Sequence, residues 1–93
     1  MRTIRRTARF KKDYKREAKG RHRTTLDKDL RKLLLSLAKD ATLPPSYRDH
    51  PLTGEWKDFR DCHVKPDLVL IYRKPDAGTL DFVRLGPHGE LGL

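Results

Sequence analysis

The sequence has few of the features that would suggest secretion, a membrane span or a bound metal. Cys62 is the only cysteine, so an internal disulfide is impossible, and we expect a small, partly buried side chain in a reducing cytosol. No apolar run is long enough for a signal peptide or a membrane span. No histidine shows the close paired spacing of a common zinc motif. We therefore expect a cytoplasmic protein that uses no metal and no cofactor.

The length limits the chain to one domain, which we expect to span residues 1–93. Only 35% of the residues are hydrophobic, but these residues fall in patterned runs, which indicates a folded domain rather than disorder. A domain of this size buries a modest core. An active site is therefore expected on a shallow face rather than in a deep cleft.

Positive charge is concentrated in the first third of the chain. Residues 1–32 hold 14 Lys and Arg against 4 acids, whereas residues 33–93 hold 8 against 9. Such a field attracts polyanions, and RNA, DNA or a ribosome is the partner we favour over an acidic membrane or an acidic protein. The residues expected to contact RNA or the ribosome are Lys11, Lys12, Lys15, Arg16 and Lys19.

Periodicity predicts a strand and two helices in the N-terminal half. Residues 2–7 contain β-formers and predict a short strand. Apolar residues then recur every four positions from Ala8 to near Gly20, which predicts a basic amphipathic helix. A second helix, which Thr24 or Thr25 can cap, fades by Asp40. It carries the strongest periodic signal in the chain, an apolar stripe made of Leu26, Leu30, Leu33, Leu34 and Leu37.

The C-terminal half reads as a loop followed by three strands. Residues 40–55 are rich in Pro, Asp, Ser and Gly and predict the loop. The predicted strands cover 56–64, 68–73 and 80–85, with a turn at 75–78. The order β-α-α-β-β-β predicts an α+β fold, with two N-terminal helices packed on a small, mainly antiparallel sheet.

Five polar residues of the strand-rich half could form an active site at one end of the sheet. They are His50, His63, Asp67, Arg84 and His88. RNA can be cut without metal when a base takes the proton of the 2′-hydroxyl and an acid protonates the departing 5′ oxygen. Histidine suits both tasks, an arginine can stabilise charge on phosphorus, and a carboxylate can orient an imidazole. His22 receives no role beyond the charged surface.

Each of these residues also has a structural interpretation. A histidine in a loop is often only polar surface, and His50 beside Pro51 could be a turn residue. Asp67 could start a strand, and Arg84 could pair with Asp81 or Asp67. Spacing alone therefore leaves catalysis open.

Longer motifs resemble a known family. The run 47–72 contains D-H-P-L-x-G-x-W from Asp49, R-D-x-H-V-x-P-D from Arg60, and the strand residues Ile71-Tyr72. Residues 84–88 give R-x-G-x-H. With the basic first helix and the leucine-rich second, these motifs resemble the YafQ branch of the RelE/ParE toxin superfamily over essentially the whole chain.

The resemblance implies a type II toxin that enters the ribosomal A site and cleaves the mRNA there, and a cognate antitoxin that wraps it. It also implies a free toxin that is monomeric and a toxin–antitoxin complex of higher order. The family's functional positions fall on His50, His63, Asp67, Arg84 and His88. The sequence departs from the family at its end, where residues 88–93 lack the aromatic that members often carry, and at Leu68, where some have Trp.

Two other functions are compatible with parts of the sequence. A ParE-like protein inhibits DNA gyrase and cuts no RNA, but such an activity leaves the histidines without a task. A non-catalytic RNA- or ribosome-binding module would use the basic helix alone, and its binding would weaken steeply with salt.

Overall fold

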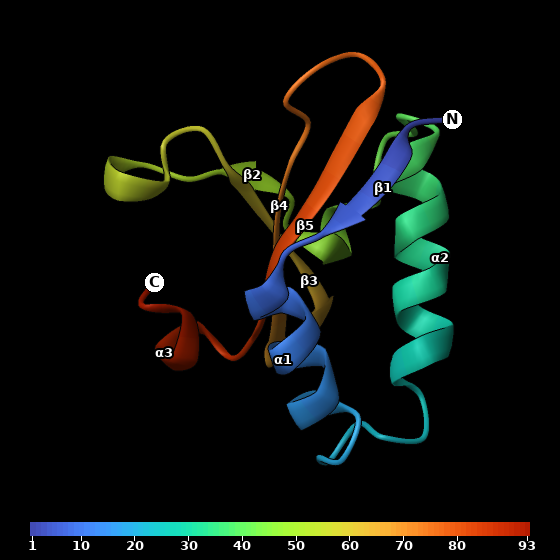
Figure 1. Ribbon diagram of the computed structural model, residues 1–93. Helices are drawn as coiled ribbons and strands as arrows, with labels where there is room; N and C mark the ends of the chain where they lie inside the picture. Colours follow the sequence, from blue (N-terminus) through green and yellow to red (C-terminus); the bar gives the residue numbers. More distant parts are fainter.

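A five-stranded sheet forms the centre of the computed structural model, which describes residues 1–93 (Figure 1). The strands lie in the order β1-β5-β4-β3-β2. Their bounds are Thr3–Arg6 for β1, His50–Pro51 for β2, Arg60–Lys65 for β3, Leu68–Arg73 for β4 and Thr79–Gly86 for β5. Only β1 is parallel to its neighbour, β5, and every other pair is antiparallel. The predicted α+β fold with a mainly antiparallel sheet is confirmed.

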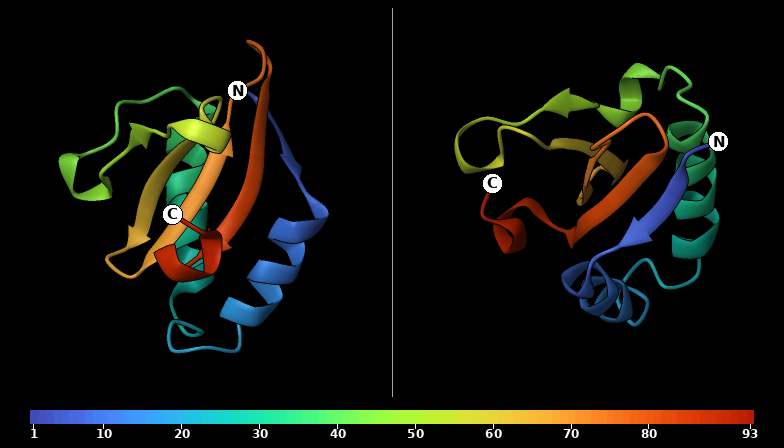
Figure 2. Two further views of the ribbon diagram at one scale, coloured as in Figure 1. Left: turned by 90° about the vertical axis from the view of Figure 1, so that its left-hand side faces the viewer. Right: turned by 45° about the horizontal axis from the view of Figure 1, so that its top comes forward.

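Helices lie on both faces of this sheet. Helix α2 (Leu26–Ala38) covers one face and α3 (His88–Leu91) lies over the other, while α1 (Ala8–Glu17) runs beside the edge near β1 (Figure 2). Two short 3-10 turns, Pro45–Tyr47 and Gly54–Trp56, complete the chain. None of these helices combines the length and the apolar character that a bilayer crossing would need.

The leucine stripe of α2 supplies the core, as its period predicts. Leu26, Leu33 and Leu37 are at most 2% exposed, and they pack with Cys62 and Leu70 of the sheet. Burial raises the pKa of the Cys62 thiol far above its ordinary value, so the reactive thiolate is disfavoured. The expectation of a buried structural cysteine is confirmed.

Two element boundaries differ from the prediction. The strand expected over 56–64 begins only at Arg60, because Gly54, with φ of 65°, starts a 3-10 turn that ends at Trp56. The expected loop over 40–55 contains β2, in which His50 pairs with Asp61. A two-residue strand that includes a proline carries no periodic signal, so sequence patterning could not find it.

The register of the sheet aligns polar residues on the face opposite α2. Residues directly opposite one another in an antiparallel pair share a face. His50 lies opposite Asp61, Asp61 opposite Ile71, and Ile71 opposite Arg84, which makes one row across four strands. His63 joins the same face two residues after Asp61.

Candidate active site

Three histidines surround one buried carboxylate, that of Asp61 in β3. His50 Nδ1 is 3.1 Å from Asp61 Oδ1, and His88 Nε2 is 3.9 Å from Asp61 Oδ2. His63 and His88 meet as a perpendicular pair with ring centroids 5.1 Å apart. The structure thus gathers His50 from β2, His63 from β3 and His88 from the start of α3. The sequence predicted that these histidines would converge.

Backbone carbonyls fix the tautomers of two imidazoles. His50 Nδ1 lies 2.6 Å from the carbonyl oxygen of Arg48, and His63 Nδ1 lies 3.3 Å from that of Pro66. A carbonyl oxygen only accepts, so Nδ1 carries the hydrogen in both rings. The lone pair of each neutral ring is therefore on Nε2, which is the nitrogen available to take a proton from a substrate.

Asp61 is a candidate site residue that the sequence interpretation missed. The residue is 1% exposed, and its Oδ1 has no hydrogen-bond partner because the His50 Nδ1 hydrogen is directed to the carbonyl of Arg48. Burial raises the pKa of the Asp61 carboxyl, and positive charge on the three histidines opposes that rise. The available signal was the alternation in β3, which places Asp61 and His63 on the same face.

A cavity of about 530 Å³ lies beside this cluster. Asp61, His50 and His88 form its polar side, and Leu52, Trp56 and Leu93 form its apolar side. His50 and His88 are about half exposed, with side-chain exposures of 51% and 49%, whereas His63 is buried. A polyanionic chain could therefore reach two imidazoles from solvent.

Asp67 lies outside the histidine cluster. Its carboxylate, in the turn between β3 and β4, accepts from His22 Nε2 at 2.8 Å and lies 3.2 Å from Arg21 Nη1. The hydrogen bond with His22 lowers the pKa of Asp67. His22, which the sequence left without a role, thus ties the loop between α1 and α2 to this turn.

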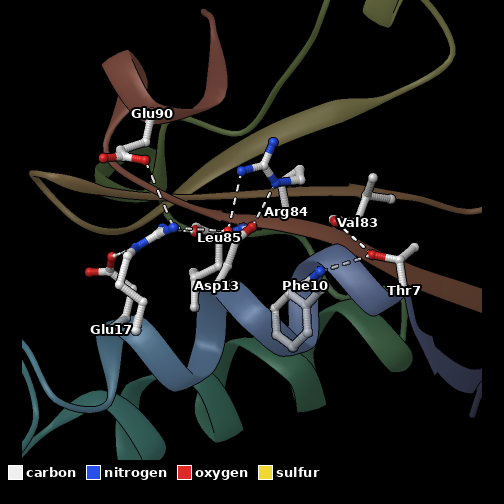
Figure 3. Close-up of polar contacts among 9 residues, drawn as sticks. Thr7, Phe10, Asp13, Glu17, Val83, Arg84, Leu85 and Glu90 are labelled. Atoms are coloured by element: carbon white, nitrogen blue, oxygen red, sulfur yellow. Dashed lines mark hydrogen bonds and ion pairs between the residues drawn. The ribbon is translucent and has the colours of Figure 1, made fainter.

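Arg84 is also engaged elsewhere. Its Nε and Nη2 donate to the carboxylate of Asp13 on α1, at 2.7 and 3.2 Å, and only 11% of the side chain is exposed (Figure 3). Asp13, rather than Asp81 or Asp67, is therefore its partner. Arg84 lies two strands from Asp61 in the polar row, about 10 Å away at ordinary strand spacing.

Basic side chains of α1 differ in how free they are. Lys11, Lys12 and Lys15 are exposed, as is Lys19, which lies two residues beyond the end of the helix. Arg16 instead donates to the Leu85 carbonyl at 3.0 Å and to the carboxylate of Asp13 at 3.1 Å. All five predicted RNA-contacting side chains thus reach the surface, but Arg16, 41% exposed, is also engaged in holding the fold together.

The fold and the site define a small basic α+β domain with a histidine–carboxylate cluster on the open face of its sheet. A family model described as the bacterial toxin of type II toxin–antitoxin systems, YafQ, matches residues 2–92. The chain therefore belongs to the YafQ family of toxins, which confirms the resemblance seen in its motifs.

Relatives support this membership over the whole length. The mRNA interferase toxin YafQ of Escherichia coli K12 is 40% identical over 90 residues, which cover 95% of this chain and 97% of the relative. A copper-bound mutant toxin from Helicobacter pylori has a TM-score of 0.85 at 35% identity, with 98% of this chain and 99% of that chain covered. YafQ in the E. coli DinJ–YafQ complex has a TM-score of 0.79 at 35% identity, with 98% of both chains covered.

Proposed function

We propose that this toxin is a ribosome-dependent endoribonuclease that cuts mRNA in the ribosomal A site without a metal ion. The observation that carries the proposal is the placing of three imidazoles around the buried carboxylate of Asp61. The E. coli K12 relative is named an mRNA interferase toxin, which supports the same activity.

Proton transfer by the histidines would drive the cut. A neutral imidazole takes the proton of a 2′-hydroxyl, and the 2′ oxygen attacks the adjacent phosphorus. The bond from phosphorus to the 5′ oxygen breaks, and a protonated imidazole gives that oxygen its proton. The products are a 2′,3′-cyclic phosphate and a 5′-hydroxyl. The free Nε2 of the half-exposed His50 fits the base, and the exposed His88 beside Asp61 fits the acid, while the buried His63 packs against His88.

Asp61 would favour this chemistry through its charge. An ionised carboxylate 3–4 Å from two imidazoles stabilises the positive charge that either ring gains during proton transfer. The low local dielectric around a buried group strengthens that interaction. Asp61 therefore acts on the imidazoles and not on the RNA.

Asp67 and Arg84 take supporting positions in this proposal. Arg84 keeps one guanidinium nitrogen beyond the two that Asp13 engages, and this nitrogen is the group proposed to face a bound phosphate. Asp67, 43% exposed in its side chain, is proposed to meet RNA or a protonated ring when the partner docks.

Two macromolecular partners are proposed. Exposed lysines of α1, among them Lys11, Lys12 and Lys15, would contact ribosomal RNA phosphates. A cognate antitoxin follows from the family, and a solved complex of the E. coli relative contains DinJ. We propose that acidic residues of the antitoxin cover α1, that the free toxin is a monomer, and that the complex is a higher oligomer.

Toeprinting on ribosomes that carry a defined mRNA tests this function. We expect a new mRNA end within the A-site codon and no cut in the same mRNA without ribosomes. A chelator selective for transition metals, added at constant magnesium, should leave the rate unchanged. Equal cutting of free mRNA would contradict the ribosome dependence, and a loss of cutting that added metal restores would contradict the metal-free chemistry.

A DNA gyrase supercoiling assay with the same preparation separates the ParE-like alternative. The proposed function predicts no inhibition of supercoiling. Inhibition of gyrase without any mRNA cut would replace the nuclease proposal. Binding to ribosomes with neither activity would leave the non-catalytic binding module as the function.

A further inference from the structure

The cavity beside Asp61 has an apolar wall in addition to the proposed proton-transfer groups that line it. Trp56, Leu52 and Leu93 form this wall. Trp56 is the only tryptophan in the chain and remains partly exposed. Neither proton transfer by the histidines nor the proposed contacts of Asp67 and Arg84 with RNA require an indole at this position.

The indole of Trp56 packs against Phe59, which in turn lies beneath the Arg73 guanidinium. It meets Phe59 at an interplanar angle of 79°, with centroids 5.2 Å apart. The Arg73 guanidinium lies 5.4 Å from the Phe59 centroid and also donates to Asp81 at 3.0 Å. In a perpendicular pair, one ring presents its edge, so Phe59 leaves at least one face of the indole uncovered.

We infer that this cavity is a nucleobase subsite, in which one mRNA base stacks on Trp56 while its phosphate faces the histidines. The inference rests on the proposed nuclease function. A cavity of about 530 Å³ with an apolar wall and a few polar groups has the character of a small-ligand site. Aromatic side chains bind unpaired RNA bases by stacking, whatever the base.

Leu93 is another large apolar residue of the subsite, and it remains exposed. The residue is 42% exposed and lines the same cavity as Trp56. An aliphatic side chain there can contact a base, but it cannot add a second aromatic face. Residues 88–93 contain no aromatic ring. Base stacking at this subsite therefore depends on Trp56.

Intrinsic fluorescence reports on this subsite directly, because Trp56 is the sole tryptophan. The probe is a 2′-O-methyl RNA trinucleotide, which the proposed chemistry cannot cut. Its control is the same trimer with an abasic central position, which keeps the phosphates and removes one base. We expect saturable quenching by the intact trimer and at least fivefold weaker binding of the abasic trimer. Equal effects of the two trimers, or no quenching at millimolar concentration, would overturn the subsite.

Variants extend the test to the ribosome. Trp56→Leu should slow A-site cutting about 5- to 100-fold and leave ribosome affinity unchanged, while Trp56→Phe keeps most of the rate. Leu93→Phe, at an exposed position, should tighten trimer binding without any cost in folding. Unchanged cutting by Trp56→Leu, with a parental thermal melt, would reject the subsite and leave the nuclease standing. Base-dependent quenching without any cut on ribosomes would instead reject the nuclease and keep the subsite.

Discussion

Asp61 occupies an unusual position for a carboxylate. It is almost fully buried, it has no lysine or arginine partner, and one of its oxygens makes no hydrogen bond. Such burial costs free energy, because water would solvate the charge better. When one of the three surrounding histidines is protonated, its positive charge stabilises the carboxylate and offsets part of that cost. We infer that the fold tolerates a destabilising charge because the imidazoles use it.

Replacing Asp61 with Asn should therefore separate stability from activity. The amide keeps the shape but removes the charge, so mRNA cutting on ribosomes should fall about 10- to 100-fold, as for other residues that support a reacting side chain. Binding to ribosomes should not change. Cutting at the parental rate would show that Asp61 has no part in the chemistry.

The stability of the same variant should depend on pH with a definite sign. Burial places the pKa of Asp61 above its ordinary value in the folded state, so the parent loses stability as pH rises from the ordinary carboxyl range through that folded pKa. Asp61→Asn does not undergo this loss. Its free energy of unfolding at pH 7, measured in urea, should equal or exceed that of the parent. A large destabilisation at pH 7 would contradict the interpretation of Asp61 as an uncompensated charge.

Residue types and motif order allowed the sequence to indicate the three histidines, but not their shared carboxylate. His50, His63 and His88 converge because β2, β3 and α3 meet at one face, and the longer motifs carry that information. Asp61 and Asp67 are both acids close to His63 in sequence. Only the register of β3 decides that Asp61 faces the cluster while Asp67 turns to His22.

At the scale of elements, α1 completes the edge of β5 where β1 ends. The pairing of β1 with β5 stops at Phe82, which leaves the rest of β5 without a strand partner on that side. Thr7 Oγ1 donates to the Val83 carbonyl, and Asp13 accepts from the Leu85 N–H (Figure 3). Arg16 donates to the Leu85 carbonyl. Side chains of the helix thus replace the hydrogen bonds of a missing strand.

Asp13 is the centre of that edge, so Asp13→Asn should destabilise the fold. Its carboxylate accepts from Arg84 and from the Leu85 N–H, and we expect a loss of about 1–3 kcal/mol in the free energy of unfolding at pH 7. Asp58, exposed and unpaired, gives a matched control, because Asp58→Asn should stay within about 0.5 kcal/mol of the parent. Urea denaturation measures both variants.

Lowering the pH should reduce the difference in the free energy of unfolding between the parent and Asp13→Asn. Burial alone would raise the pKa of Asp13, but hydrogen bonds from Arg84 and Leu85 hold it below its ordinary value. The stabilisation is therefore complete above the ordinary carboxyl pKa of about 4, and it is lost as pH falls through the lowered one. A difference that stayed constant into strong acid would show that the charge of Asp13 is not its source.

Periodicity allowed the sequence to predict the long elements and not the short ones. The leucine stripe of α2 and the apolar run of β4 both lie where expected, because each buries a face with a clear period. The strand β2 and the helix α3 are too short to show one, and tertiary contacts define them. Both elements carry site histidines, so the least predictable elements shape the cluster.

At the scale of the whole molecule, the lysines proposed to bind RNA and the histidines proposed to cut it occupy different elements. Helix α1, which carries exposed lysines, runs beside one edge of the sheet, and α2 covers one sheet face (Figure 2). The register of the strands places the histidine cluster on the other face. We infer that affinity for the ribosome comes from the helix and that cutting comes from the sheet. Variants of the two regions should therefore fail in different ways.

The most direct test of this account measures A-site cutting and ribosome affinity in parallel for two variants. His88→Ala should lose cutting and bind ribosomes like the parent. The double variant Lys11→Glu and Lys15→Glu should bind more weakly, with a salt dependence reduced by about 2 in log–log slope, and should regain its cutting rate at saturating ribosome concentration. Lys28→Glu with Lys32→Glu makes the same charge change on α2 and should weaken binding less. A His88→Ala protein that cuts at the parental rate would contradict the proposed nuclease site.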